Sequence, residues 1–501
     1  MSFVPASGPY SRAQRIAITV PVLMASLLHA INMSTAYVAL PNIQGNLSAT
    51  PDQISWIITA FVVASAIGTV LTGWLSARLG RRFVFLGAIL GFTVTSALAS
   101  SAGSLESLVF HRVLQGFVSA PLLPISQSIM LDTYPRHKHG FAMSIWSMGM
   151  ILGPVVGPTL GAFLTEWYGW RYLFLANIPF GVVAFVAIFA VLPRVAGERR
   201  PLDWVGVTAL IVAVGALQLM LDRGEGENWF ESSEVVIEAA AAAIAFYVLI
   251  VHSLTADKPY INLSLFRDRN YVVGLSLIFV FGVAVFSSLF ILPLFLQNVQ
   301  NYPVIAAGWV VSSRGLGTMA AMLVAGYLTD RLPAKYLILT GLACVGVSNL
   351  LMTDWTAQVG LTEVVWLTVI NGFGMGLMWV TLTVVTFSTL TPQLRVEGAA
   401  LFSLIRAIGA SMGTSVIVSI MVRSAQVNYM QLREHVQDFN PNLRAYELST
   451  GIDPHSAGGL MALRNLVGAE ALLIAFLNDF VFLFVIAAAA APLVFLLRRA
   501  R

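Results

Sequence analysis

The sequence predicts an all-α integral membrane protein with fourteen transmembrane helices. Of its 501 residues, 57% are hydrophobic and only 10% are charged, whereas roughly a quarter are charged in an ordinary soluble domain. Fourteen apolar stretches have about the twenty residues that a helix needs to cross roughly 30 Å of hydrocarbon. Lys and Arg also gather in alternate connections between these stretches, as expected if each stretch crosses the membrane in the direction opposite to the one before it.

Polar connections, most of them short, separate the apolar stretches. The first stretch begins just after Arg12 and Arg15, is too long for the apolar core of a signal peptide, and is expected to remain as a span. The single cysteine, Cys344, falls inside the eleventh stretch, so no disulfide within the chain is expected. The stretches lie near 15–40, 54–76, 83–101, 107–130, 140–164, 170–192, 204–221, 234–254, 271–296, 304–328, 335–352, 362–390, 397–422 and 474–497.

The distribution of charge predicts the orientation of the chain. Of the 28 Lys and Arg residues, nineteen fall in one set of alternate connections, six fall in the opposite set, and Arg112, Arg314 and Arg406 lie inside spans. Because cytoplasmic connections carry an excess of Lys and Arg, the first set, which includes both termini, is predicted to be cytoplasmic. The formal net charge of +4 therefore reflects membrane topology, and no nucleic-acid partner is expected.

A sequence repeat divides the chain into two related halves. The segment 73–82 after the second stretch resembles the segment 326–335 after the tenth, and the small residues spaced by four from Gly149 to Gly161 resemble Ala407, Ser411, Ser415 and Ser419. Parallel repeats of this kind build transporters that enclose a binding site near the bilayer midplane. We expect a six-helix half over 1–202, an inserted helix pair over 203–254, and a second six-helix half over 255–501 with a long extracytoplasmic loop over 423–473.

Short motifs with a characteristic order and spacing carry a family resemblance. They are Val38–Pro41, Gly73–Arg82, Arg112–Gly116, Pro121–Gln127, Gly149–Gly161, Asn177–Gly181, Leu221–Gly224 and Leu263–Arg267. With these motifs the chain resembles, over essentially all its spans, the 14-span drug:proton antiporters of the major facilitator superfamily, the EmrB/QacA type. It looks most similar to the EmrB-like inner-membrane pumps.

The resemblance implies a major facilitator fold and secondary active export of amphiphilic drugs or toxic compounds by proton antiport and alternating access. It implies no cofactor, the proton gradient as energy source, a place in the bacterial cytoplasmic (inner) membrane, and a contribution to antibiotic resistance. EmrB-like pumps join a periplasmic adaptor and an outer-membrane channel, so such partners are implied too, with the loop 423–473 as a docking surface.

Other functions stay open on the sequence alone. The same architecture also suits uptake of a specific metabolite or nutrient, or a non-transporting membrane receptor. No HExxH or Walker sequence occurs, so neither a zinc hydrolase nor an ATPase is expected, and we expect neither an enzyme nor a metal site.

Glycines spaced by four predict a flat face on the fifth span, and two prolines among them predict a bend. In the family this pattern marks antiporters, and that resemblance supplies the direction of transport. Close helix packing alone is the structural alternative. The motif consists of Gly149, Gly153, Pro154, Gly157, Pro158 and Gly161.

The connection after the second span, with its copy after the tenth, is expected to act in cytoplasmic gating. Its arginines can pair with acidic side chains or helix C-termini as a latch, or simply anchor the loop. Ala77 stands where the family has an aspartate. The gating residues are Gly73, Arg78, Gly80, Arg81, Arg82, Asp330 and Arg331.

Four intramembrane positions are candidates for proton coupling. An arginine inside a span costs about 2.5–3.5 kcal/mol, and the family implicates the residue matching Arg112 in coupling. Asn32 occupies the position of a family aspartate and cannot titrate. His29, one turn earlier, is our hypothesis for its replacement, against the alternative of a neutral histidine that binds a neighbouring span. Asp479 is the carboxylate alternative.

Three intramembrane arginines and few acids in the spans predict a positive interior, which favours neutral or anionic amphiphiles as substrates. Aromatic and methionine side chains suit an adaptable pocket, although such residues more often face lipid or core. The expected lining residues are Gln115, Trp146, Phe290, Arg314, Met375, Met378, Trp379 and Arg406.

Overall fold

In the computed structural model, every regular element among the described residues is a helix. The structure describes residues 10–49, 51–193, 203–224, 226–256, 259–329, 331–391, 394–436, 443 and 456–498. The long helices are α1 (Arg12–Leu47), α2 (Pro51–Leu79), α3 (Arg81–Ser100), α4 (Leu105–Ser119), α5 (Leu122–Thr133), α6 (His139–Tyr168), α8 (Asn177–Val191), α9 (Trp204–Arg223), α10 (Ser233–Thr255), α11 (Arg269–Asn298), α12 (Val304–Leu328), α13 (Ala334–Met352), α14 (Leu361–Phe387), α15 (Arg395–Glu434) and α17 (Ala457–Val494). Shorter ones are α7 (Arg171–Leu175), η1 (Arg136–Lys138), η2 (Trp229–Glu231) and η3 (Leu263–Arg267).

The helices are consistent with the fourteen predicted spans. Within the described residues, twelve helical segments are long and apolar enough to cross a membrane, with α4–α5 and α7–α8 each forming one segment. Helices α6 and α12, of 30 and 25 residues, coincide with the other two predicted spans but are not among these twelve. The break between α4 and α5 coincides with Pro121, because proline lacks the N–H that a continuous helix uses. The chain is thus an all-α, multi-pass membrane protein.

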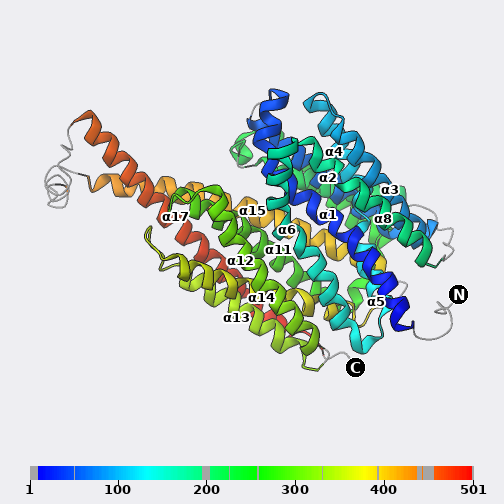
Figure 1. Cartoon of the computed structure of the whole chain (residues 1–501). Helices are drawn as coiled ribbons and strands as arrows, with labels where there is room; N and C mark the ends of the chain where they lie inside the picture. The colour runs from blue at the N-terminus through cyan, green and yellow to red at the C-terminus, as the bar shows by residue number, and fades with distance from the viewer. Residues whose placement is uncertain are drawn as a thin grey trace.

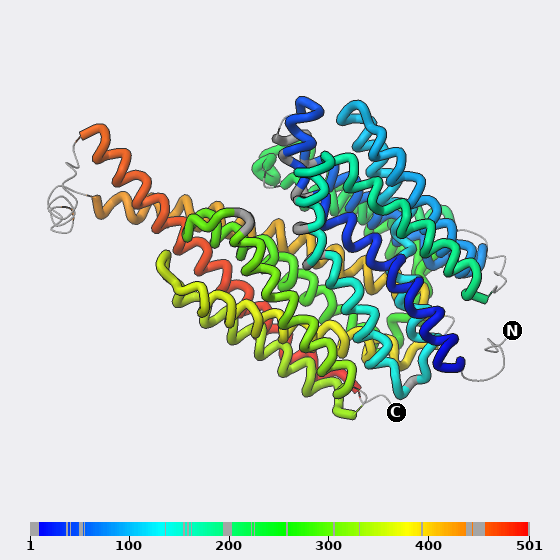
Figure 2. Tube along the Cα trace, viewed as in Figure 1, coloured from blue at the N-terminus to red at the C-terminus, as the bar shows by residue number. Residues whose placement is uncertain are grey.

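The spans form two groups with the same internal packing (Figure 1). In the first group α1 packs on α6, α2 on α4, and α3 on α8; in the second, α11 packs on α15, α12 on α14, and α13 on α17. Figure 2 shows the first group, blue to teal, beside the second, green to red, with the start of α1 and the end of α17 at the same end of the molecule. Two related six-helix halves therefore build the fold.

Helices α15 and α17 continue beyond the bundle as a projecting pair (Figure 1). The sequence predicted a loop over 423–473, but α15 runs to Glu434 and α17 begins at Ala457. The Asn478 amide donates to the Ser424 hydroxyl at 2.7 Å, which ties α17 to the extension of α15. The structure therefore corrects the loop prediction at 423–434 and 457–473, where the chain is helical.

The inserted helices α9 and α10 pack on each other, and α9 also contacts α2 and α15. Two hydrogen bonds join this pair to α15. Gln218 Nε2 donates to Ser411 Oγ at 2.8 Å, and Trp229 Nε1, in η2, donates to Ser419 Oγ at 3.0 Å. The inserted pair therefore lies against one helix of each half.

This arrangement corrects the weaker of the two sequence repeats. The glycines that were predicted to correspond to Ser411 and Ser419 pack α6 against α1 within the first half. Ser411 and Ser419 instead bind Gln218 and Trp229. On α15 the corresponding contact is made by Gly409 and Gly413, where an added Cβ would meet the backbone of α11. The small-residue spacing was recognised correctly, but its register on the helix was wrong because α15 carries two faces of small residues.

Asp203, the N-cap of α9, joins the start of α9 to the end of α10 and the segment that follows it. Its carboxylate accepts the Gly206 N–H and the Tyr260 N–H, each at 2.9 Å, and lies 2.7 Å from His252 Nε2. Burial alone would raise the pKa of this carboxyl, but the hydrogen bonds outweigh burial and hold the pKa below its usual range. The Tyr260 hydroxyl donates to the Val70 carbonyl of α2, and burial raises the pKa of this phenol, so it stays a donor.

Candidate functional site

A buried chain of polar side chains links three helices of the first half. Arg112 Nε donates to the Ile57 carbonyl of α2 at 3.1 Å, and Arg112 Nη1 donates to Gln115 Oε1 at 2.7 Å. Gln115 Nε2 in turn donates to Ser96 Oγ on α3 at 2.8 Å. The guanidinium also lies 4.3 Å from the centre of the Phe61 ring, a cation–π contact. Gln115, predicted to line a cavity, is fully buried in this network.

The second half repeats this chain with its arginine moved to another helix. Arg314 Nη2 on α12 donates to Asn371 Oδ1 on α14 at 3.0 Å, and Asn371 Nδ2 donates to Ser348 Oγ on α13 at 2.9 Å. Both halves therefore use an arginine, an amide and a serine to join equivalent helices. Sequence reasoning missed Asn371 and Ser348, which lie on the helices of the second half equivalent to those that carry Gln115 and Ser96.

His29 and Asn32 occupy one buried face of α1, with exposures of 5% and 1%. The His29 ring packs on Phe61 with the ring centroids 5.5 Å apart, so Phe61 contacts both His29 and Arg112. Neither His29 Nδ1 nor Asn32 Nδ2 has a hydrogen-bond partner in the part of the chain that the structure describes. The structure thus brings three of the four candidate coupling residues to the α1–α2–α4 contact.

Asp479, the fourth candidate, lies apart from the other three, on α17 in the second half. It is completely buried, and neither carboxylate oxygen has a hydrogen-bond partner among the described residues. About fifteen residues separate it from the cytoplasmic end of α17, or roughly 22 Å at 1.5 Å per residue. That depth is past the middle of a bilayer core of about 30 Å.

The glycine face of α6 packs on α1 next to the candidate coupling residues. A Cβ added to Gly153 would lie 2.5 Å from Ala30 Cβ, and one added to Gly161 would lie 3.1 Å from the Thr35 carbonyl oxygen. The Ser34 hydroxyl donates to the Gly153 carbonyl at 2.9 Å. Gly149 and Gly157 face α1 in the same way, through Leu23 and Ser34. Pro154 and Pro158 lie within α6. The motif therefore fixes α1, which carries His29 and Asn32, against α6.

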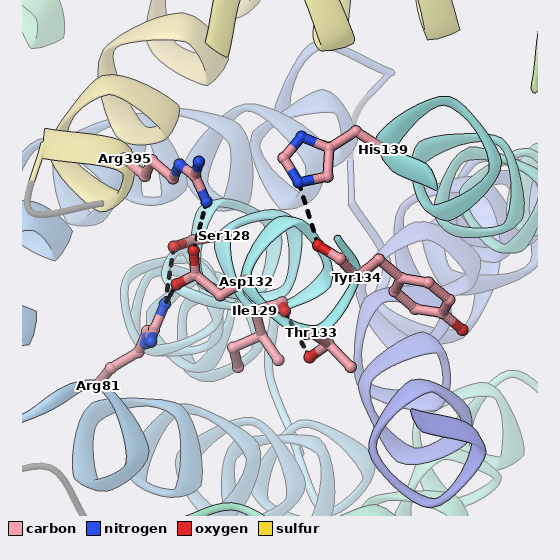
Figure 3. Close-up of polar contacts among 8 residues, drawn as sticks. All are labelled: Arg81, Ser128, Ile129, Asp132, Thr133, Tyr134, His139 and Arg395. Atoms are coloured by element: carbon pink, nitrogen blue, oxygen red, sulfur yellow. Dashed lines mark hydrogen bonds and ion pairs between the residues drawn. The ribbon is translucent and has the colours of Figure 1, made fainter. Parts of the chain in front are cut away.

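At the end of the bundle where α1 begins and α17 ends, which was predicted to be cytoplasmic, one carboxylate joins the two halves (Figure 3). Asp132 on α5 accepts Arg81 Nη1 at 2.5 Å through Oδ2 and Arg395 Nη1 at 2.6 Å through Oδ1. Arg81 Nη1 also donates to Ser128 Oγ at 2.9 Å. Arg81 belongs to the predicted gating loop, whereas Arg395 begins α15 of the second half. The contact between Asp132 and Arg395 was not predicted, because nothing in the sequence places these two residues together.

The other predicted gating residues make contacts of their own. Gly80 is the N-cap of α3 and has φ 86°, a conformation that favours glycine. A Cβ on Gly73 would lie 3.3 Å from Glu397 Cα, so α2 closely approaches α15. Arg82 Nη2 donates to the Phe189 carbonyl at 2.5 Å. Arg78 lies over the Trp74 ring at 5.0 Å and Arg331 over the Tyr327 ring at 3.8 Å. Asp330 lies outside the described residues.

Two tryptophans stack across the halves deeper in the bundle. The rings of Trp146 on α6 and Trp379 on α14 are 6.3 Å apart and inclined by 12°. Trp379 Nε1 donates to Ser147 Oγ at 2.6 Å, and Ser144 Oγ donates to the Met322 carbonyl of α12 at 2.5 Å. All these contacts lie in the half of each helix that is nearer to Asp132. Together with the Asp132 pairs they join the two halves at that end.

The remaining predicted lining residues have varied surroundings. Met375 Sδ contacts Arg314 Nη2 at 2.7 Å, Met378 is buried, and Phe290 is 37% exposed. Arg406 lies over the rings of Trp379 and Phe286 at 5.8 and 5.9 Å.

Two further observations concern other chemistries. The string Gly409-Ala410-Ser411-Met412-Gly413 has the spacing of a serine-hydrolase motif, but it lies inside α15 rather than at a strand-to-helix turn. Within the described residues, no group of three or more His, Cys, Asp or Glu side chains is placed to hold a metal ion.

Comparison with known proteins assigns the family. The Major Facilitator Superfamily model matches residues 22–414. The chain is 34% identical over 441 residues to "Multidrug export protein EmrB" of Escherichia coli (strain K12), covering 87% of this chain and 86% of that protein. It is 31% identical over 428 residues to "Fatty acid resistance protein FarB" of Neisseria gonorrhoeae, covering 85% and 84%.

Solved structures show the same fold at low identity. The human organic anion transporter MFSD10 (TETRAN) has a TM-score of 0.59 and 16% identity, covering 94% of this chain and 99% of that one. The proton:xylose symporter XylE has a TM-score of 0.58 and 14% identity, covering 95% and 97%. The chain belongs to the Major Facilitator Superfamily and, within it, to the family of the EmrB multidrug export proteins.

Proposed function

We propose that this transporter exports amphiphilic drugs or toxic compounds from the cell in exchange for protons. Relatives named for multidrug export and for fatty acid resistance match it over most of its length. Two six-helix halves that meet through breakable contacts at one end suit alternating access, in which one half rocks against the other. The closed cytoplasmic end corresponds to the state that faces outward.

The observation that carries the proton part of this proposal is the buried carboxyl of Asp479. An ionised carboxylate buried without a hydrogen-bond donor is costly, and binding a proton removes that cost. Asp479 is completely buried and has no partner for either oxygen within the described structure. It is also well placed in depth, because a coupling site must be reached from each side in turn. Asp479 is therefore our first candidate for the proton carrier.

His29 is the second candidate, and Arg112 and Asn32 support it by position. His29 shares the Phe61 ring with Arg112, so a change of charge on the imidazole would be felt by the Arg112 network. Asn32, which cannot titrate, lies one turn further along α1. If His29 carries the proton, its removal abolishes coupling while Asp479→Asn does not.

Transport in inverted membrane vesicles with an imposed pH gradient tests the proposal. We expect gradient-dependent accumulation of at least one compound from a panel of anionic, neutral and cationic amphiphiles. Asp479→Asn should abolish the gradient dependence and Asp479→Glu should retain part of it, whereas the exposed control Asp354→Asn should behave as wild type. The proposal of antiport fails if no panel member moves in response to the gradient.

We further propose that the protein lies in the bacterial inner membrane with both termini in the cytoplasm, and that it joins a periplasmic adaptor and an outer-membrane channel. The α15–α17 extension is the surface proposed for the adaptor, because it projects from the end opposite to the Asp132 contact. Co-purification of an adaptor with the wild-type chain, and its loss after residues 427–466 are replaced by a short flexible linker, is the expected result. Retention of the adaptor by that variant would contradict the docking surface.

A further inference from the structure

Arg406 is a membrane-embedded cation that makes no hydrogen bond or ion pair within the described part of the chain. It lies on α15 about eleven residues from the cytoplasmic end, or roughly 16 Å at 1.5 Å per residue, which is near the bilayer midplane. Its side chain is half-buried. An ionisable side chain at that depth is costly and normally pairs with another group. The absence of a partner therefore calls for a functional explanation.

The other two arginines inside spans are used differently. Arg112 donates to Ile57 and Gln115, and Arg314 donates to Asn371. Both thus hold helices of one half together. Arg406 instead presents its guanidinium to two aromatic rings, those of Trp379 and Phe286. Such rings favour a nearby cation, but they leave the five N–H donors of the guanidinium available to an acceptor.

Arg406 stands at one end of a ridge along α14. Asn371, Met375 and Trp379 follow one another at successive turns of this helix. Arg314 contacts the first two, and its Nη1 is buried without a hydrogen-bond partner in the described structure. Arg406 contacts the third. Two guanidinium groups with unused donors therefore flank a buried methionine and tryptophan on α14.

This ridge is also part of the contact between the halves. Trp379 stacks on Trp146 of the first half, so a molecule lying on Trp379 would meet the aromatic contact that closes the cytoplasmic side. Its apolar body would rest on the rings and its acidic head would receive the N–H donors. Guanidinium groups bind carboxylates through paired, charge-assisted hydrogen bonds.

We propose that Arg406 is a specificity-determining residue that binds the acidic head group of an aromatic organic anion, while Trp379 and Phe286 hold the aromatic body of that substrate. This assignment rests on the proposed export function and adds the group that selects substrates by charge. It predicts that loss of the Arg406 charge affects anions and spares neutral molecules of the same shape.

Equilibrium dialysis with the purified full-length chain in lipid nanodiscs tests this at pH 8. The three probes share one naphthalene body: 2-naphthoate, 2-naphthalenemethanol and (2-naphthylmethyl)trimethylammonium. We expect Arg406→Gln to raise the Kd for 2-naphthoate at least about tenfold, as loss of a charge-assisted hydrogen-bond pair does, and to change the Kd for the alcohol less than about twofold. Arg406→Lys should recover part of the 2-naphthoate affinity, because it restores the charge but not the paired geometry.

Two more variants separate charge recognition from general damage. Trp379→Ala should weaken all three probes, since it removes the shared aromatic surface. Arg433→Gln, on the exposed extension of the same helix, should change none. The inference is overturned if Arg406→Gln leaves 2-naphthoate binding unchanged, if it weakens all three probes equally, or if the wild type does not bind 2-naphthoate. Binding is measured without a pH gradient, so these outcomes are independent of whether gradient-driven export occurs.

Discussion

Arg395 donates to Asp132 at 2.6 Å across the two halves, while the second oxygen of the same carboxylate holds Arg81 at 2.5 Å. Asp132 is thus a single acidic residue between one arginine of its own half and one of the other. If the halves separate on the cytoplasmic side, as alternating access requires, the Arg395 contact must break while the Arg81 contact can persist. The pair is therefore a lock on the closed state rather than a fixed part of one half.

The substitution Asp132→Asn should open the cytoplasmic side. Hydrogen bonds to charged groups contribute about 1.5–3 kcal/mol each, so losing the carboxylate charge should shift the equilibrium between closed and open states by roughly tenfold or more. Spin labels on cysteines at His137 and Leu332, both exposed, should show a larger share of long distances by double electron–electron resonance.

The labelled variants carry Cys344→Ser so that only the two chosen sites react. Asp354→Asn, a substitution of an exposed acid at the opposite end of the molecule, serves as the control and should leave the distance distribution unchanged. An unchanged distribution in Asp132→Asn would show that the lock is elsewhere.

Gly153→Ala should disrupt the packing of α1 on α6. The added Cβ would lie 2.5 Å from Ala30 Cβ and 2.7 Å from the Ala30 carbonyl carbon, and overpacking of this kind costs about 1–3 kcal/mol. We expect a lower apparent melting temperature and impaired transport. Gly308→Ala, where no atom lies within 4 Å of the new Cβ, should be tolerated. Equal stability of the two variants would refute the close packing of this motif.

The membrane-spanning helices were predictable from the sequence because the bilayer imposes a length and an apolar composition on each of them. The close packing of the glycine motif was predictable for a similar reason, since it is a local pattern. The extension of α15 to Glu434 was not expected as a firm helix, because hydropathy stops reporting helices where they leave the membrane.

The cross-half contacts were beyond the reach of sequence patterns. Asp132 and Arg395 are separated by 263 positions, and their pairing depends on how the two halves meet. Likewise, the sequence shows that Arg406 lies in a span but not that it lacks a partner. Its unpaired state follows only from the positions of all its neighbours.

Arg112→Lys should weaken the first half although it keeps the charge. Lysine cannot donate to both Ile57 and Gln115 with the geometry of the guanidinium, and a buried polar group left without its partner costs about 1–3 kcal/mol. We expect a lower apparent melting temperature together with reduced gradient-driven transport. Asn371→Leu is the parallel test in the second half, where it should destabilise through Arg314 and Ser348. If both variants have the melting temperature of the wild type, the two networks do not stabilise the protein.

The carboxyl of Asp203 should make the stability of the folded protein fall as the pH is lowered. Hydrogen bonds hold the pKa of this carboxyl below its usual range, so its contribution to stability is fully present above the pKa of the unfolded chain and is lost as the pH falls through the lower folded pKa. Asp203→Asn should therefore reduce the apparent melting temperature near pH 7 and lose this difference from wild type in strong acid. A difference that grows as the pH falls would have the wrong sign for this account.

Cross-linking should distinguish which half carries the inserted helices. Gln218 and Trp229 bind α15 through Ser411 and Ser419, whereas Tyr260 reaches α2 through a single hydroxyl. If the inserted pair moves with the second half, the Tyr260 contact must break and α9 must slide along α2 during transport. In a Cys344→Ser background, a short bis-maleimide linker between cysteines at positions 218 and 411 should therefore preserve transport. The same linker between cysteines at positions 260 and 70 should arrest transport. In control variants that carry only one cysteine of either pair, the reagent should leave transport unchanged. Arrest by the 218–411 linker with free transport in the 260–70 pair would assign the inserted helices to the first half.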